Sequence, residues 1–159
     1  MRPRVYIETT IPSFYHAGRT DVENAAKQII TRRWWRDERS DFRLVTSVAT
    51  VNELQQSGRG DLRDRRIALL DGVDGLDITP GVVSVAQVYI RQFVMPNDAQ
   101  GDALHLALAS FYACDYLLTW NCKHLANARK ADHIEQVNRR LGLHVPRIVT
   151  PEQLMAPDT

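Results

Sequence analysis

The stretch VYIETTIPSFY, residues 5–15, shows the pattern that decides the fold. Its apolar beginning predicts a short buried strand over residues 4–8. Proline is tolerated in the first turn of a helix, so we expect a helix to begin near Pro12. Glu8 and Thr10 lie where the two elements meet. Glu8 is therefore either a residue that helps the chain enter the helix or a ligand at the mouth of a site.

The same alternation of strand and helix continues along the chain. Apolar runs predict further strands over residues 42–47, 76–81 and 116–120, and a short strand followed by a helix start within 147–155. Apolar residues at helical spacing predict helices over 21–39, 48–57, 82–95, 98–115 and 131–142. A further helix is expected to start in the arginine-rich segment 58–66 and to continue to residue 70. Asp21, Ser47 and Asp98 are the expected N-caps, and Gly142 the expected stop.

This order of elements predicts an α/β fold with a central parallel sheet between helices. The 159 residues contain no repeat, low-complexity segment or linker, so we expect one domain over residues 1–155 and a frayed tail at 156–159.

Charge and apolar content exclude some partners. The chain has 20 basic and 19 acidic residues, so its overall charge indicates neither a nucleic acid nor a membrane. No run approaches the roughly 18 apolar residues of a membrane span, and the short apolar run after the basic N-terminus is too short for a signal peptide. Cys114 and Cys122 lack the spacing of a metal site, which favours reduced thiols. We therefore expect a soluble cytoplasmic protein whose functional charge is local.

Four polar side chains lie near the ends of the expected strands or in the helices beside them: Glu8, Glu53, Asp102 and Asn121. In an open parallel sheet, ligands bind outside the carboxyl ends of the strands. Each residue alone has a simpler explanation, since Glu8 or Asp102 can serve the dipole of its own helix and Glu53 can be solvated. Three carboxylates at one end of a sheet, however, would repel one another unless a cation joined them.

A hard divalent cation such as Mg²⁺ or Mn²⁺ prefers oxygen ligands, often one or two carboxylates completed by water and substrate phosphate. Such a site suits phosphodiester cleavage, because the metal lowers the pKa of a bound water and offsets charge on the transition state. The sequence has no nucleophile elbow and no glycine-rich phosphate loop that would favour other chemistry.

Four segments, IETTIPSFY, TVNEL, DALHLALA and LLTWN, resemble in order and spacing the four acidic motifs of PIN-domain proteins, the fold of the VapC toxins. The resemblance covers about residues 4–150. It implies a three-layer α/β/α fold and a ribonuclease that uses Mg²⁺ or Mn²⁺. It also implies a toxin–antitoxin pair, with RNA as substrate, a cognate antitoxin as partner, and a homodimer.

Carried over by position, the resemblance makes Glu8, Glu53, Asp102 and Asn121 the catalytic residues, with Glu8 and Asp102 holding the metal. Glu8 stands where the family usually has aspartate, and Asn121 where a fourth aspartate is common, which predicts weaker metal binding. One alternative is a catalytically weak PIN-like domain that binds RNA or a protein. Another is a phosphatase-like hydrolase, which would need a nucleophilic aspartate at position 8.

Neighbouring polar residues are secondary candidates for the substrate or for support of the site. Thr10 either bonds Glu8 or a metal-bound water, or caps the helix. His105 either orients a phosphate or packs in the core. Lys123 and His124 follow the strand that ends near Trp120, where they either contact RNA phosphates or belong to a solvated loop.

Two arginine-rich segments are further candidates for binding RNA. In the first, residues 32–36, adjacent Trp34 and Trp35 cannot share one helix face, so we expect one in the core and the other to anchor a protein interface or, less favoured, to stack RNA bases. The second contains Arg59, Arg63, Arg65 and Arg66. It is the better footprint for a phosphate backbone, although Asp61 and Asp64 dilute its charge.

Overall fold

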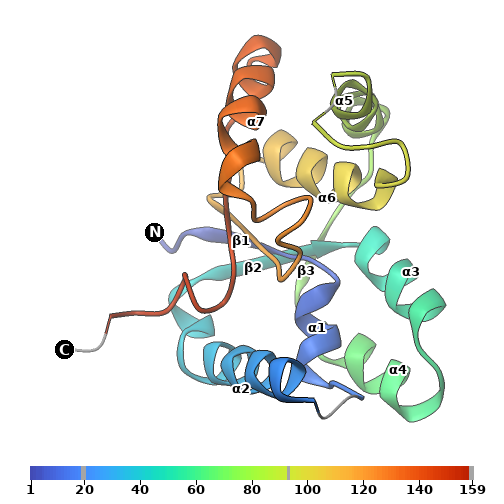
Figure 1. The fold of residues 1–159 in the computed structure, drawn as a ribbon, viewed down its shortest axis with the longest axis vertical. Helices are drawn as coiled ribbons and strands as arrows, with labels where there is room; N and C mark the ends of the chain where they lie inside the picture. The colour runs from blue at the N-terminus through green and yellow to red at the C-terminus, as the bar shows by residue number, and fades with distance from the viewer. Residues whose placement is uncertain (19–20, 93, 158–159) are drawn as a thin grey trace.

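The computed structural model describes residues 1–18, 21–92 and 94–157 and confirms the α/β prediction. Within this part of the chain, five strands form one parallel sheet (Figure 1). The strands are β1 (Arg4–Ile7), β2 (Arg43–Ser47), β3 (Asp74–Leu76), β4 (Tyr116–Leu118) and β5 (Arg147–Val149).

Helices follow most of the strands, as the alternation predicts. They are α1 (Thr10–Tyr15), α2 (Val22–Asp37), α3 (Val48–Ser57), α4 (Gly60–Ala68), α5 (Pro80–Arg91), α6 (Gln100–Phe111) and α7 (Ala128–Leu141), together with the short 3₁₀ helix η1 (Arg39–Asp41). Two predicted helix ends are confirmed. The side chain of Asp21 accepts a hydrogen bond from the amide of Asn24, and Gly142 ends α7 with a φ of 69°. None of the helices in the described residues is long and apolar enough to cross a membrane.

The strand order in the sheet is β3-β2-β1-β4-β5. The chain therefore builds outward from β1 in one direction, through β2 and β3, and then adds β4 and β5 on the other side. This reversal lies between β1 and β4, whose register pairs Tyr6 with Leu117 and Ile7 with Leu118. In parallel sheets, the crevice at such a reversal, outside the carboxyl ends of the strands, is the usual place for a ligand.

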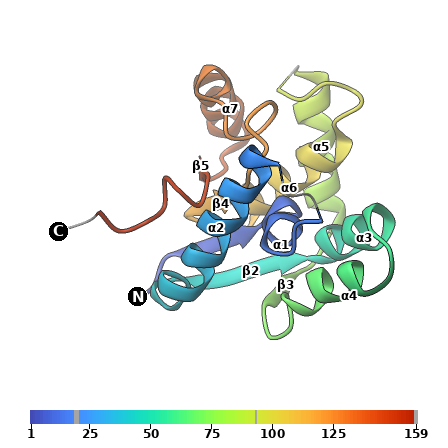
Figure 2. The ribbon, with the colours of Figure 1, turned by 60° about the horizontal axis from the view of Figure 1, so that its bottom comes forward.

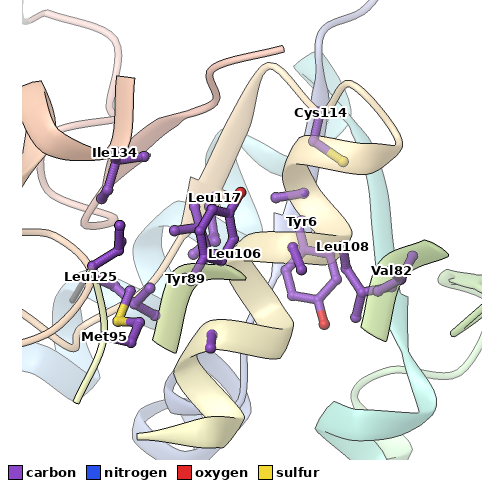
Figure 3. Packing of buried hydrophobic residues seen from close by; sticks show 14 of the residues in the cluster. Tyr6, Val82, Tyr89, Met95, Leu106, Leu108, Cys114, Leu117, Leu125 and Ile134 are labelled. Carbon is purple, nitrogen blue, oxygen red and sulfur yellow. The ribbon is translucent and has the colours of Figure 1, made fainter. Parts of the chain in front are cut away.

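Helices cover both faces of the sheet, which gives three layers (Figures 1 and 2). Alternate residues of β1 contribute to the two cores: Tyr6 belongs to the cluster under α5, α6 and α7, while Val5 and Ile7 belong to the cluster with α1 and α2. Figure 3 shows Tyr6 and Leu117 packed in the first cluster with Leu106 and Leu108 of α6. Because β1 is buried on both faces, its position in the sheet is tightly constrained.

Several predicted boundaries are wrong for local reasons. The strand expected over residues 76–81 ends at Leu76, because Thr79 caps α5 by accepting a hydrogen bond from Val82 N and Pro80 begins that helix. Asp98 does not cap α6, since the N-cap position belongs to Ala99. After β5 the chain forms turns rather than the expected helix.

Two more predictions need correction. Ser47 precedes α3 but makes no side-chain cap bond, because its hydroxyl lies 2.7 Å from the Tyr6 hydroxyl. The expected division between a core and an interface tryptophan is also wrong, since Trp34 is fully buried and Trp35 is 7% exposed. The ring of Trp35 is enclosed by Tyr15, 6.3 Å away between ring centroids, and by the guanidinium of Arg39, 4.7 Å from its centroid.

Candidate functional site

Glu8 lies at the reversal of strand order and joins β1 to β4. Its amide donates to the carbonyl of Leu118 at 3.3 Å. Glu8 is 3% exposed, and its carboxylate accepts hydrogen bonds from Thr10 N (2.6 Å), Thr10 Oγ1 (3.0 Å) and the hydroxyl of Thr119. The bond to Thr10 N satisfies an amide in the first turn of α1, so Glu8 does help the chain enter that helix.

Thr10 connects this carboxylate to the segment after β4. Its hydroxyl donates to Glu8 Oε2 and also accepts a hydrogen bond from Trp120 N at 2.8 Å. The N-cap position of α1 belongs to Thr9, so of the two interpretations of Thr10 the contact with Glu8 is confirmed. These bonds hold Glu8 in one orientation at the carboxyl edge of the sheet.

Glu53 and His105 form a hydrogen-bonded pair between α3 and α6. Glu53 Oε1 lies 2.8 Å from His105 Nε2, and Glu53 Oε2 accepts from the hydroxyl of Thr9 at 2.6 Å. The other ring nitrogen, His105 Nδ1, lies 2.7 Å from the hydroxyl of Tyr6. The side chain of His105 is 1% exposed and that of Glu53 is 37% exposed. His105 is thus a buried residue whose two ring nitrogens both have protein partners, so neither is free to orient a substrate phosphate.

Asp102 and Asn121 meet at the start of α6. Asp102 is half-buried, and a side-chain hydrogen bond with Asn121 acts to lower its pKa. Asn121 Oδ1 accepts hydrogen bonds from Lys123 N (3.2 Å) and His124 N (3.0 Å), so the side-chain amide nitrogen is the group that faces Asp102. Lys123 is exposed, and His124 is half-buried and near enough for its charge to favour ionised Asp102.

Burial and the charge of His105 set the electrostatics of the three acids. Burial raises the pKa of Glu8 and of Asp102, and the negative charge of Glu53 adds to the rise at Asp102. Burial also acts to raise the pKa of Glu53, but His105 and Thr9 outweigh it and the pKa is lowered. Burial disfavours the charged ring of His105, yet Tyr6 and the carboxylates of Glu53 and Glu8 raise its pKa well above the usual range. His105 therefore supplies positive charge to all three carboxylates.

Carboxylate oxygens are the ligands that a hard divalent cation prefers, but few carboxylates are placed to share one ion at this site. Among the described residues, no group of three or more His, Cys, Asp or Glu side chains is placed to hold a metal. Of the hydrogen bonds described above, Glu8 Oε1 accepts only the one from Thr10 N, so one of its lone pairs remains available to a metal. The nearby positive charge of His105 favours the ionised form of Asp102. A site of one or two carboxylates completed by water and phosphate is common for Mg²⁺. Glu8 and Asp102 are the residues that would hold the ion.

Gly101 is a site residue that the sequence analysis missed. A Cβ at this position would lie 2.8 Å from Glu53 Oε1, closer than side-chain contacts allow. The glycine therefore gives the carboxylate of Glu53 the room it needs to reach His105. The neighbouring Asp102 was a candidate from the sequence, but nothing in the sequence connects Gly101 with Glu53, which is distant in the chain.

No protein-family model matches the chain, and no curated protein sequence matches it. The likeness to PIN-domain proteins thus rests on the four motifs and on the positions of their residues.

Replacing Gly101 with alanine tests the packing against Glu53. The added methyl group displaces the carboxylate from His105, so we expect the pKa of His105 to fall toward its ordinary value. Alanine favours helix by up to about 1 kcal/mol over glycine, so the fold should be retained. An NMR titration of the His105 ring measures the effect, with Gly75→Ala as control because its Cβ meets open space. An unchanged His105 pKa in Gly101→Ala would contradict this packing.

The His105–Glu53 pair predicts a pH-dependent stability. The contribution of His105, whose folded pKa is raised, is complete below 6.5 and is lost as the pH rises through the folded pKa. The contribution of Glu53, whose folded pKa is lowered, is present above 4.5 and is lost as the pH falls through its folded pKa. The pair therefore contributes most between pH 4.5 and pH 6.5, and its contribution declines above pH 6.5 until the pH has passed the raised pKa of His105.

The test is urea unfolding of wild type and His105→Gln over this pH range, with the exposed His144→Gln as control. The difference in free energy of unfolding between wild type and His105→Gln should narrow at both pH extremes. A difference that is constant with pH would show that the pair makes no ionic contribution.

Proposed function

We propose that this chain is an endoribonuclease that depends on Mg²⁺ or Mn²⁺ and cleaves RNA phosphodiester bonds. The observation that carries the proposal is the gathering of Glu8, Glu53 and Asp102 around one buried histidine at the reversal of strand order. Ligands bind at this place in parallel sheets, and the PIN-like motifs supply the same acids. The α/β fold and its strand order support the proposal.

The divalent ion, when bound, would lower the pKa of a coordinated water and offset charge on the scissile phosphate. Thr10 and Thr119 fix the carboxylate of Glu8 toward the edge of the sheet, and Asn121 orients Asp102. The lowered pKa keeps Glu53 ionised at neutral pH. Its exposed side can then orient a water molecule or accept a proton from it.

A second candidate function is an RNA- or protein-binding module without efficient catalysis. It is favoured by the hydrogen bonds that already occupy the proposed ligands. Both oxygens of Glu8 accept bonds from protein donors, and Asn121 Oδ1 accepts two backbone amides. Such prior bonding weakens any metal site. The phosphatase-like alternative has less support, because position 8 holds a buried glutamate rather than a nucleophilic aspartate.

The resemblance also carries the biological proposal. We propose that the chain is the toxin of a type II toxin–antitoxin pair, acts in the cytoplasm as a homodimer, and is held inactive by a cognate antitoxin. A short neighbouring reading frame that encodes a small DNA-binding protein would support this role.

Asp102→Asn tests the nuclease. It keeps the shape of the side chain but removes the charge that would hold the ion, so metal-dependent cleavage should fall by at least about a hundredfold, the scale of losing one electrostatic contact in an active site. The fold should survive, because burial already disfavours the charged carboxylate. Cleavage of a mixed RNA in Mn²⁺ measures the first effect and thermal unfolding measures the second.

Asp98→Asn is the matched control, since it makes the same change on an exposed side chain shortly before α6. Equal cleavage by the Asp102→Asn and Asp98→Asn variants would contradict the assignment. If wild type neither cleaves RNA nor gains thermal stability in millimolar Mn²⁺, the binding-module function is favoured instead.

A further inference from the structure

Three arginine side chains from two helices surround the end of α1. Arg32 of α2 donates through Nε to the carbonyl of Tyr15 at 2.8 Å, and Arg66 of α4 donates through Nε to the carbonyl of His16 at 2.9 Å. Partial burial lowers the pKa of the His16 ring, and the charges of Arg32, Arg65 and Arg66 lower it further. We call Arg32, Arg65 and Arg66 the arginine cluster. Figures 1 and 2 show α1 between α2 and α4, which explains how residues so distant in sequence meet.

Within the described residues, no ion pair with a carboxylate neutralises the arginine cluster. Other basic side chains of the same two helices are paired: Arg63 lies 3.2 Å from Asp64, and Lys27 lies 3.2 Å from Glu23. Gathering like charges is unfavourable unless an anion joins them. Because Arg32 and Arg66 are anchored through Nε, their terminal nitrogens are oriented in advance for the paired hydrogen bonds that arginine makes with phosphate.

An aromatic surface connects the arginine cluster with the acidic site. A pocket of about 520 Å³ is lined by Ser13, Phe14, Ala17, Gly18, Asn24 and Arg66. The ring of the half-buried Phe14 meets the edge of Trp120, 6.2 Å away between centroids, and Lys27 Nζ lies 5.1 Å from the Phe14 centroid. Trp120 donates its amide to Thr10 and directly precedes Asn121. From Thr10 to His16, the helix rises roughly 9 Å, a distance that a short oligonucleotide can span.

We infer that the arginine cluster binds a backbone phosphate of single-stranded RNA, whose neighbouring bases contact Phe14 and Trp120 on the way to the acidic site. This inference rests on the proposed function and specifies how its substrate is held. Guanidinium groups beside aromatic rings are the combination that single-stranded nucleic acids use, with charge along the backbone and rings against the bases. An acidic protein segment would use the charge but would leave the aromatic surface without a role.

Binding of a short fluorescent single-stranded RNA of mixed sequence, followed by anisotropy in EDTA, tests this inference without cleavage. We expect Arg32→Gln/Arg66→Gln to bind at least about tenfold more weakly and to reduce the slope of log affinity against log salt by about 0.7, the contribution of one phosphate contact for single strands. Arg91→Gln and Arg140→Gln, on the exposed surfaces of α5 and α7, should bind as wild type does.

If the double variant unfolds, Arg65→Gln provides a second test. Arg65 makes neither of the hydrogen bonds to α1, so its replacement should leave the fold intact. It should weaken RNA binding and reduce the salt slope, though by less than the double variant does. Unchanged binding by Arg65→Gln and by the folded double variant would overturn the inference. Competition by poly-glutamate as effective as that by unlabelled RNA would also overturn it and would indicate an acidic protein partner.

Cleavage assays separate this inference from the nuclease proposal. If wild type binds RNA through the arginine cluster but never cleaves it with Mn²⁺, the inference stands and the nuclease is excluded. If wild type cleaves RNA and the arginine variants cleave equally well at subsaturating RNA, the nuclease stands and the inference is excluded.

Discussion

The contact between Glu53 and the buried His105 is the interaction on which the candidate site depends. Glu53 comes from α3 and His105 from α6, so this 2.8 Å hydrogen bond joins the two helices above the carboxyl edge of the sheet. The positive ring also acts on Glu8 and Asp102. Because the His105 ring is buried, the loss of Glu53 would remove one carboxylate that stabilises its positive charge. The ring of His105 thus supplies part of the positive charge that offsets the three acids.

Strand order brings these groups together. The reversal between β1 and β4 places Glu8 beside Thr119, while the helices that follow β2 and precede β4 carry Glu53 and Asp102. The same arrangement leaves α1 to lead from the acidic site toward the arginine cluster. A catalytic centre and a surface for holding substrate would then share one short helix. Exposed Lys123 lies beside Asn121 at the same edge of the sheet.

Much of the fold could be predicted because its signals are local. Apolar runs followed by helical periodicity located β1, α2, β2 and α7, and proximity to strand ends selected Glu8 and Asn121. The predicted boundaries were wrong where a helix cap sets the start of the helix, as Thr79 does for α5. Contacts between residues that are distant in sequence could not be predicted. Neither the pairing of Tyr6 with His105 nor the space that Gly101 leaves for Glu53 has a signal in a single sequence.

We propose that Glu8 and Asp102 share a divalent ion beside the His105–Glu53 pair. The most direct test of this proposal is a crystal grown with Mn²⁺ and measured for anomalous scattering. We expect a single peak coordinated by oxygens of Glu8 and Asp102, with the hydrogen bond between Glu53 and His105 intact. No peak there at saturating Mn²⁺, or an ion bound by Glu53 after His105 has moved away, would contradict it.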